Sequence, residues 1–266
     1  MENMDVLQSA LLKQIPGLAH GFFRPGDSTN RDANLSFKNG PAETVRAARR
    51  RACGMLGIPA EHLTHVYQEH GTVIWTVSRE HRGAGALTGR DQVGPGDGLI
   101  TAQSGVPLAI LIADCLPVFF SAPHAEAVGI AHAGWKGTLG NIAARMAERL
   151  AAECGIGPDA LRVWIGPGIS LRGFTVQDDV WEPFQEAWGR YPECFDERRR
   201  GIDLKQINRL QLMEAGVPEV YIDISPDCTF SDPRFFSYRR DGAGSGHNLA
   251  VIQRSDNGLG NGSGHG

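Results

Sequence analysis

Residues 127–165 read AVGIAHAGWKGTLGNIAARMAERLAAECGIGPDALRVWI, and this stretch decides the fold class. The segments Ala127–His132 and Leu161–Ile165 are apolar runs, typical of strands that are covered on both faces. Between them, apolar residues recur every four positions from Ile142 and predict a helix over Thr138–Glu153. A strand, a glycine turn, a helix and a second strand make a βαβ-like unit. The sequence therefore predicts an α/β fold.

The same patterns predict elements on both sides of this unit. Further strands are expected at Leu63–Gln68, Thr72–Val77, Leu108–Ala113, Val118–Ser121, Val220–Ile224 and Leu249–Gln253. Further helices are expected at Pro41–Leu56, Asp178–Gly189 and Leu204–Ala215. With 41% hydrophobic residues and no evident linker, the chain can bury one core. We expect a single domain over residues 1–254, a mixed β-sheet covered by helices, followed by a flexible Gly/Ser/Asn-rich tail at 255–266.

Composition limits the classes of protein to which the chain can belong. The 266 residues carry 26 Lys and Arg against 30 Asp and Glu, so the net charge of −4 offers no overall positive surface for nucleic acid. The apolar run Val106–Ala113 is too short to span a membrane, which takes about 20 residues. The acidic start at residues 1–5 and five scattered cysteines predict a cytoplasmic protein. We expect no nucleic acid or membrane partner, and the oligomeric state stays open.

Three residues that can bind a metal ion lie at the ends of predicted strands. His70 and Cys115 each come shortly after a strand, and His132 ends one. Ligands collect at the carboxyl ends of strands in open α/β sheets, so neighbouring strands would bring the three together. Two imidazoles and one thiolate suit Zn²⁺ and leave a fourth position for water or substrate. Spacing alone favours the simpler interpretation, a buried cysteine and two hydrogen-bonded histidines, because no short ligand motif joins them.

Two other segments are candidates for binding an anion. The turn Gly134–Thr138 precedes the predicted helix, whose first amide groups favour phosphate, although the turn does not match the P-loop pattern. A tight connection without a ligand explains it equally well. Arg239 and Arg240 follow an aromatic run and form either a clamp for phosphate or carboxylate, or a solvated charged edge. The glycine-rich run 242–246 precedes a strand rather than a helix, so it is not a dinucleotide-binding turn.

Several short motifs occur in order along the chain. They read QEHG at 68–71, DGLIT at 97–101, ADCLPV at 113–118, HAGWKG at 132–137, IGPGI at 165–169, CT at 228–229 and FSYRR at 236–240. With them, over about residues 16–253, the chain resembles the laccase-domain family. That family is also called multicopper polyphenol oxidase-like or purine nucleoside phosphorylase family and includes the peptidoglycan editing factor. The resemblance implies a single α/β domain of the family's own fold type.

The resemblance also implies a site. Carried over by motif, His70, Cys115 and His132 hold a zinc ion, with copper as the alternative metal. The catalytic candidates are Asp114, Cys115 and His132. The substrate-binding candidates are Asn34, Gln68, Lys136, Arg239 and Arg240. The chain departs from the family's usual residues at Glu69, Lys136, His247 and the loop 24–28.

The family is credited with phosphorolysis of adenosine, inosine, guanosine and methylthioadenosine, and with deamination of adenosine. We therefore expect a zinc-dependent purine nucleoside phosphorylase with adenosine deaminase activity, which binds a purine nucleoside and phosphate. In deamination a metal-bound water would react, and Asp114 would move the proton. The turn Gly134–Thr138, with Lys136 and Arg239 or Arg240, would hold phosphate. Cys115 is either a metal ligand or a covalent nucleophile.

Three other functions remain as alternatives. An editing amidase that acts on peptidoglycan precursors is compatible with the same site. A copper-dependent polyphenol oxidase is disfavoured, because the nine histidines include no His-x-His pair and no methionine closely follows Cys115. A non-catalytic metal-binding protein is disfavoured because three protein ligands would leave a coordination position open.

Overall fold

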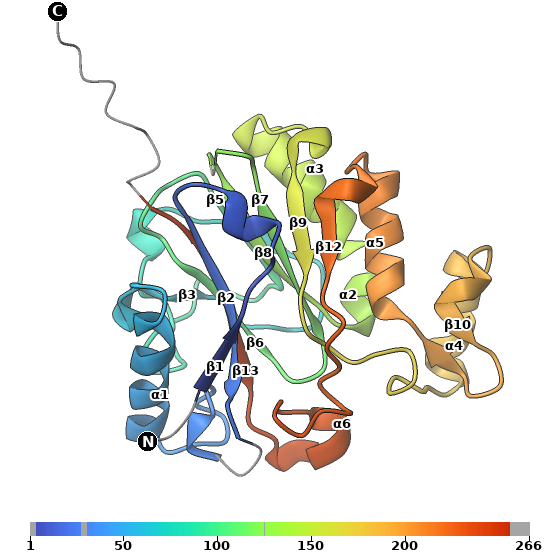
Figure 1. Cartoon of the computed structure of the whole chain (residues 1–266), viewed down its shortest axis with the longest axis horizontal. Coiled ribbons are helices and arrows are strands. Elements are labelled where there is room, and N and C mark those ends of the chain that lie inside the picture. The colour runs from blue at the N-terminus through green and yellow to red at the C-terminus, as the bar shows by residue number, and fades with distance from the viewer. Residues whose placement is uncertain (1–3, 28–30, 125, 256–266) are drawn as a thin grey trace, which may run out of the picture.

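The computed structural model describes residues 4–27, 31–124 and 126–255. Two β-sheets lie face to face, and helices cover the outer face of each (Figure 1). The layer order is therefore helix, sheet, sheet, helix, with an apolar core between each pair of neighbouring layers.

The first sheet has five strands in the order β1-β2-β13-β6-β3. All neighbours are antiparallel except β3 and β6, which run parallel. The strands are β1 (Met4–Leu7), β2 (Leu18–Pro25), β13 (Asn248–Arg254), β6 (Leu108–Ile112) and β3 (Thr64–His65).

The second sheet has six strands in the order β12-β9-β7-β8-β5-β4. Its central neighbours are antiparallel, and the outermost pair at each edge is parallel. The strands are β12 (Ile222–Ile224), β9 (Arg162–Ile165), β7 (Leu116–Ser121), β8 (Val128–Ala133), β5 (Gly98–Thr101) and β4 (Ile74–Thr76). A separate antiparallel pair is formed by β10 (Phe195–Asp196) and β11 (Gly201–Ile202).

The helices are α1 (Ala42–Gly54), α2 (Trp135–Leu139), α3 (Ile142–Cys154), α4 (Asp178–Trp188), α5 (Leu204–Glu214) and α6 (Tyr238–Asp241). Helix α1 packs on the outer face of the five-stranded sheet, whereas α3 and α5 cover the six-stranded sheet. Between the sheets, Ile110 of β6 belongs to the same buried cluster as Phe119 of β7 and Ile130 of β8. These side chains are shielded from water on both sides, which explains the continuous apolar runs in the sequence.

The structure confirms the α/β class and the βαβ-like unit, and it differs from the expectation in the number of sheets. Strands β8 and β9 run parallel because each is antiparallel to β7, which lies between them. The strands divide into two main sheets rather than one, because an apolar strand can be covered by a second sheet as well as by helices. The strands β1, β2, β5, β10 and β11 were not predicted.

The prediction of one helix over Thr138–Glu153 is wrong, because two helices, α2 and α3, cover this segment. Helix α2 begins at Trp135, inside the segment expected to be a turn, and ends at Leu139. Asn141 then has a φ of 62°, in the left-handed region, and α3 starts at the next residue. A left-handed residue breaks the i to i−4 hydrogen-bond ladder, so the apolar repeat alone did not locate the helix start.

At the C-terminal end, Ser255 is the last described residue, and its backbone N–H donates to the Gly17 carbonyl at 2.7 Å. The rest of the predicted tail, residues 256–266, lies outside the described part of the chain. Within the described part, every helix is too short or too polar to cross a membrane.

Candidate metal centre

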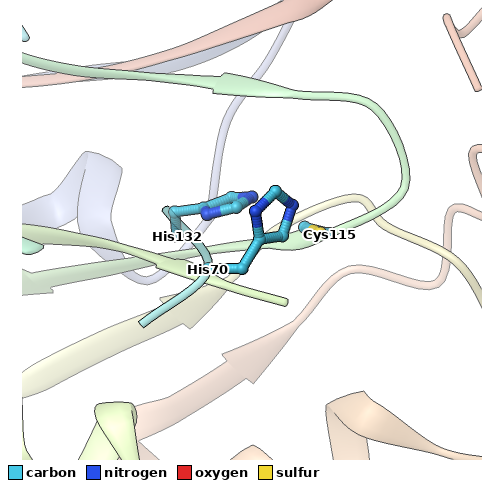
Figure 2. A group of neighbouring side chains, drawn as sticks. All are labelled: His70, Cys115 and His132. Carbon is cyan, nitrogen blue, oxygen red and sulfur yellow. The ribbon is translucent and has the colours of Figure 1, made fainter. Parts of the chain in front are cut away.

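The register of the six-stranded sheet brings two of the three predicted metal ligands together. Leu116 at the start of β7 pairs with Ala133 at the end of β8. His132 is opposite Pro117, and Cys115 precedes Leu116, so the two side chains are diagonal neighbours on one face of the sheet. His70 approaches from the loop between β3 and β4. The ligand atoms of His70, Cys115 and His132 all lie within 4.8 Å of one another, and Figure 2 shows their side chains gathered at one point.

The carboxylate of Asp97 holds two of the three candidate ligands, His70 and His132, in place through hydrogen bonds. It is fully buried, and its Oδ1 accepts a hydrogen bond from Nδ1 of His132 at 2.7 Å. With Nδ1 engaged, Nε2 of His132 is the nitrogen left to face a metal. The same carboxylate accepts from the backbone N–H groups of His70 at 2.9 Å and Gly71 at 2.6 Å. These bonds hold His70 at a φ of 63°, a conformation that a histidine rarely adopts.

Charges within the cluster favour a thiolate at Cys115. Burial alone would raise the pKa of this thiol, but the adjacent His132 and the hydrogen bonds from both histidines lower it to about 6. Burial would likewise lower the pKa of His132, but the Cys115 thiolate and Asp97 raise it to about 9. Burial would raise the pKa of Asp97 as well, yet the hydrogen bond from His132 and those from backbone amides hold it below its usual value. Metal binds the thiolate and the neutral imidazole, so a metal ion at this cluster would displace the proton that the raised pKa keeps on His132 at neutral pH.

Gly134 leaves the space that the cluster needs. A Cβ at this position would lie 3.0 Å from Sγ of Cys115 and 3.0 Å from Cδ2 of His70. Any side chain at this position would therefore crowd both ligands and would require them to shift.

The donor set fits a zinc ion. Two imidazoles and one thiolate are ordinary zinc ligands, and a fourth position would remain for water or substrate. The three residues also line a cavity of about 1220 Å³, so a substrate can reach the cluster.

Asp114 and Arg239, predicted from sequence, also line this cavity. The Oδ1 atom of Asp114 accepts from the Thr229 hydroxyl at 2.7 Å, and Oδ2 accepts from the backbone N–H of Arg239 at 2.6 Å. The guanidinium of Arg239 donates through Nη1 to the carbonyls of Gly173 and Thr175. Asp114 thus fixes the start of α6, which places Arg239 on the cavity wall.

The other predicted substrate-binding residues have different surroundings. Gln68 lines the cavity, but its side-chain amide is paired with the backbone N–H and carbonyl of Leu111. Asn34 is buried behind the wall, where its Oδ1 accepts from the backbone N–H groups of Ser36 and His247. Asn34 therefore joins two segments of the chain, and it is not among the residues that line the cavity.

Lys136 and Arg240 are also not brought to the cavity wall. Lys136 is exposed, with Nζ 5.4 Å from the ring centroid of Trp135. The Arg240 guanidinium donates to the carboxylate of Asp241 and to backbone carbonyls, including those of Thr229 and Phe235. Its donors are engaged in holding the loop around it, which leaves none directed at a ligand.

Sequence reasoning had assigned no role to Asp97 or Arg49. Asp97 directly precedes the buried strand β5, a position where a carboxylate has few water partners and must bond to protein. Arg49 lies four residues after Val45 and one after Ala48, on the buried side of α1. The sequence could have indicated a special role for Arg49, because a charged residue seldom lies on the apolar face of a helix.

A comparison with known proteins identifies the family. The family model described as multi-copper polyphenol oxidoreductase laccase matches residues 22–255. The chain belongs to this laccase family. The match confirms the resemblance carried by the motifs, and the family description implies a metal centre.

Curated relatives of the chain carry the name purine nucleoside phosphorylase. YlmD of Geobacillus stearothermophilus is 40% identical over 213 residues, which cover 78% of either chain. A protein of Deinococcus radiodurans is 34% identical over 219 residues, covering 82% of this chain and 81% of the relative. The crystal structure of YlmD from Geobacillus stearothermophilus superposes with a TM-score of 0.85 at 35% identity, covering 93% of this chain and 94% of that one. The fold is therefore that of the family.

Proposed function

We propose that this protein is a zinc-dependent purine nucleoside phosphorylase that also deaminates adenosine. The observation that carries the proposal is the cluster of His70, Cys115 and His132 on the wall of a cavity of about 1220 Å³. The names of the relatives support an enzyme of the phosphorylase type. Zinc is proposed because the donor set suits it.

The cavity offers surfaces for both parts of a nucleoside. It is lined in part by the aromatic side chains of Trp135, Phe174 and Tyr238, which suit the flat face of a purine. Arg239 lies over the ring of Phe174, 5.5 Å from its centroid, and brings a positive charge to the same wall. An aromatic surface beside a cation and metal ligands is suited to a purine base joined to a polar sugar.

The chain's own groups account for the proton movements. When bound by His70, Cys115 and His132, a zinc ion would supply Lewis-acid chemistry and would lower the pKa of a water molecule. Asp97 holds His132 in the orientation that presents Nε2. Asp114 lines the cavity, and in deamination we assign its carboxylate the transfer of a proton from the attacking water to the leaving ammonia. Adenosine and water then give inosine and ammonia, whereas a nucleoside and phosphate give the free base and ribose 1-phosphate.

Product analysis tests this proposal. The zinc-loaded protein is incubated with adenosine and phosphate, and we expect adenine with ribose 1-phosphate, together with inosine. The Cys115→Ala variant should form neither, whereas Cys154→Ala, which changes a half-buried cysteine at the end of α3, should behave as the unaltered protein. Absence of both products from the zinc-loaded protein would contradict the proposal.

Phenol oxidation is less well supported by the residues. A coupled copper centre needs several groups of closely spaced imidazoles. In the described residues, one group of three potential ligands is found, His70, Cys115 and His132. We therefore assign the site to a single metal ion.

A further inference from the structure

One wall of the cavity is basic. It is built where α1 meets the segments 36–38 and 85–92, and we call it the basic wall, defined by Ser36, Lys38, Arg49 and Arg90. Phe37 lies beneath the Arg49 guanidinium, whose carbon is 4.6 Å from the ring centroid. The carboxylates that line the cavity, Asp114 and Asp179, belong to other segments.

Arg49 stands out because its charge is buried among neutral groups. The residue is 1% exposed. Its Nε donates to the Leu35 carbonyl at 2.9 Å, and its Nη1 donates to the carbonyls of Gly85 at 3.1 Å and Ala86 at 2.6 Å. The fourth neighbour is Nε2 of His65, 3.2 Å from Nη1. Within the described part of the chain, neither a carboxylate nor any hydrogen bond to Nη2 is found for Arg49.

This arrangement leaves a positive charge without compensation. Burial lowers the pKa of Arg49 to about 10, so the guanidinium is still protonated at neutral pH. Burial also lowers the pKa of His65 well below its ordinary value, so this neighbour is neutral and accepts the hydrogen bond. Burying an unpaired charge is unfavourable unless a partner of opposite charge compensates it. Arg49 lines the cavity, so a ligand there can be that partner.

We propose that Arg49, Lys38 and Arg90 form a binding site for a phosphate group, separate from the metal ligands. Arginine suits this task because its planar donors match phosphate oxygens, and the hydroxyl of Ser36 adds a neutral donor. Asn34 positions the wall, since it accepts from the backbone of Ser36 and ties it to His247. The proposal rests on the proposed function in that phosphate is the second substrate. The same chemistry also suits the phosphate of a nucleoside 5′-monophosphate.

Direct binding separates this site from the catalytic proposal. Calorimetric titrations use inorganic phosphate, adenosine 5′-monophosphate and adenosine as three separate probes. The variants are Arg49→Gln and the double variant Lys38→Gln/Arg90→Gln, whose two side chains are exposed, so the fold does not depend on them. The control is Arg50→Gln on the same helix, an exposed arginine that pairs with Glu61. Circular dichroism checks each fold, and if Arg49→Gln does not fold, the double variant decides.

We expect both test variants to bind inorganic phosphate roughly tenfold more weakly or worse, with the control and adenosine binding unchanged. Loss for adenosine 5′-monophosphate alone would also support the site and would identify its ligand as a nucleotide. Unchanged affinity for both phosphate probes in the folded variants would overturn it. Phosphorolysis is measured separately. If the test variants turn over with an unchanged KM for phosphate and bind phosphate as the unaltered protein does, this site alone is refuted. If the unaltered protein shows no turnover but the test variants lose phosphate binding, only the proposed function is refuted.

Discussion

The atoms around the candidate metal centre are held by contacts that a single substitution can remove. Asp97 fixes the ring of His132 and the backbone of His70, and Gly134 leaves room for Cys115. Contacts of this kind restrict where the ligands can lie, and such restriction lowers the cost of binding a metal ion.

Substituting Gly134 tests this positioning. In Gly134→Ala the new Cβ would crowd Sγ of Cys115 and the ring of His70, both 3.0 Å away. Overpacking costs about 1–3 kcal/mol, so we expect zinc affinity to fall roughly 10- to 100-fold. Competition with a chelator measures it. Gly54→Ala is the control, because its Cβ would meet no atom within 4 Å. Equal zinc affinity of the two variants would show that the close approach does not matter.

Asp114→Asn tests the proton-transfer role. The amide keeps the shape and can still accept from the N–H of Arg239, so only the ionisable group is lost. We expect turnover in deamination to fall about 10²- to 10⁴-fold, with zinc content unchanged and the pH dependence altered. Thr229→Val removes a hydrogen bond to the same carboxylate and should cost much less. If the two variants lose activity equally, Asp114 only anchors the segment.

The site could be predicted from sequence only in part. His70, Cys115 and His132 were accessible because each lies at a strand end and in a recognisable motif, and the structure brings them together. Lys136 and Arg240 were selected for their charge and their place in the motifs, and neither property says where a side chain points. Arg240 is directed back at its own loop by local carbonyls, a packing effect that sequence does not record.

At the scale of elements, the helical segment that follows the candidate ligand His132 is broken between α2 and α3. Helix α2 starts immediately after Gly134, and Asn141 turns the chain into α3. The apolar repeat predicted one helix because it reports buried faces and not backbone dihedrals. Strand β5 was also not predicted, although strands of similar or shorter length, β4, β9 and β12, were.

Two substitutions at Asn141 test this break. The residue is exposed, makes no capping hydrogen bond and has a φ of 62°. Alanine is disfavoured in the left-handed region by about 1–2 kcal/mol, whereas glycine is not. We expect Asn141→Ala to be less stable than Asn141→Gly by about 1 kcal/mol in urea unfolding. Equal stability would mean that the helices join without a left-handed residue.

Across the whole molecule, the packing of the two sheets and the integrity of the site are linked. Asp114 and Cys115 lie where the chain passes from β6 in one sheet to β7 in the other. The buried interface between the sheets also contains His20, whose ring lies 5.7 Å from that of Trp164 and 6.3 Å from that of Phe119. Loss of this interface would separate the elements that carry the ligands.

His20 makes this interface sensitive to acid. Burial, aided by Lys13, lowers the pKa of His20 from 6.5 to about 4. Between these values the unfolded chain binds the proton and the folded chain does not, so the free energy of unfolding falls as pH drops below 6.5 and is unaffected above it. At pH 5 the expected loss is about 2 kcal/mol.

Denaturant unfolding at pH 7 and pH 5 measures this loss. In His20→Gln the difference in unfolding free energy between the two pH values should shrink by about 2 kcal/mol. His124→Gln, which changes an exposed histidine, should keep the full difference. The same pH dependence in His20→Gln as in the unaltered chain would remove His20 from the explanation.

X-ray absorption at the zinc edge of the purified, zinc-loaded protein reports the atoms bound to the metal and so tests whether Cys115 is a ligand. We expect one zinc per chain with a single sulfur at about 2.3 Å and nitrogen ligands at about 2.0–2.1 Å. The sulfur signal should disappear in Cys115→Ala and persist in Cys154→Ala. A first shell of nitrogen and oxygen alone in the unaltered protein would contradict the account, since Cys115 would then not be a ligand.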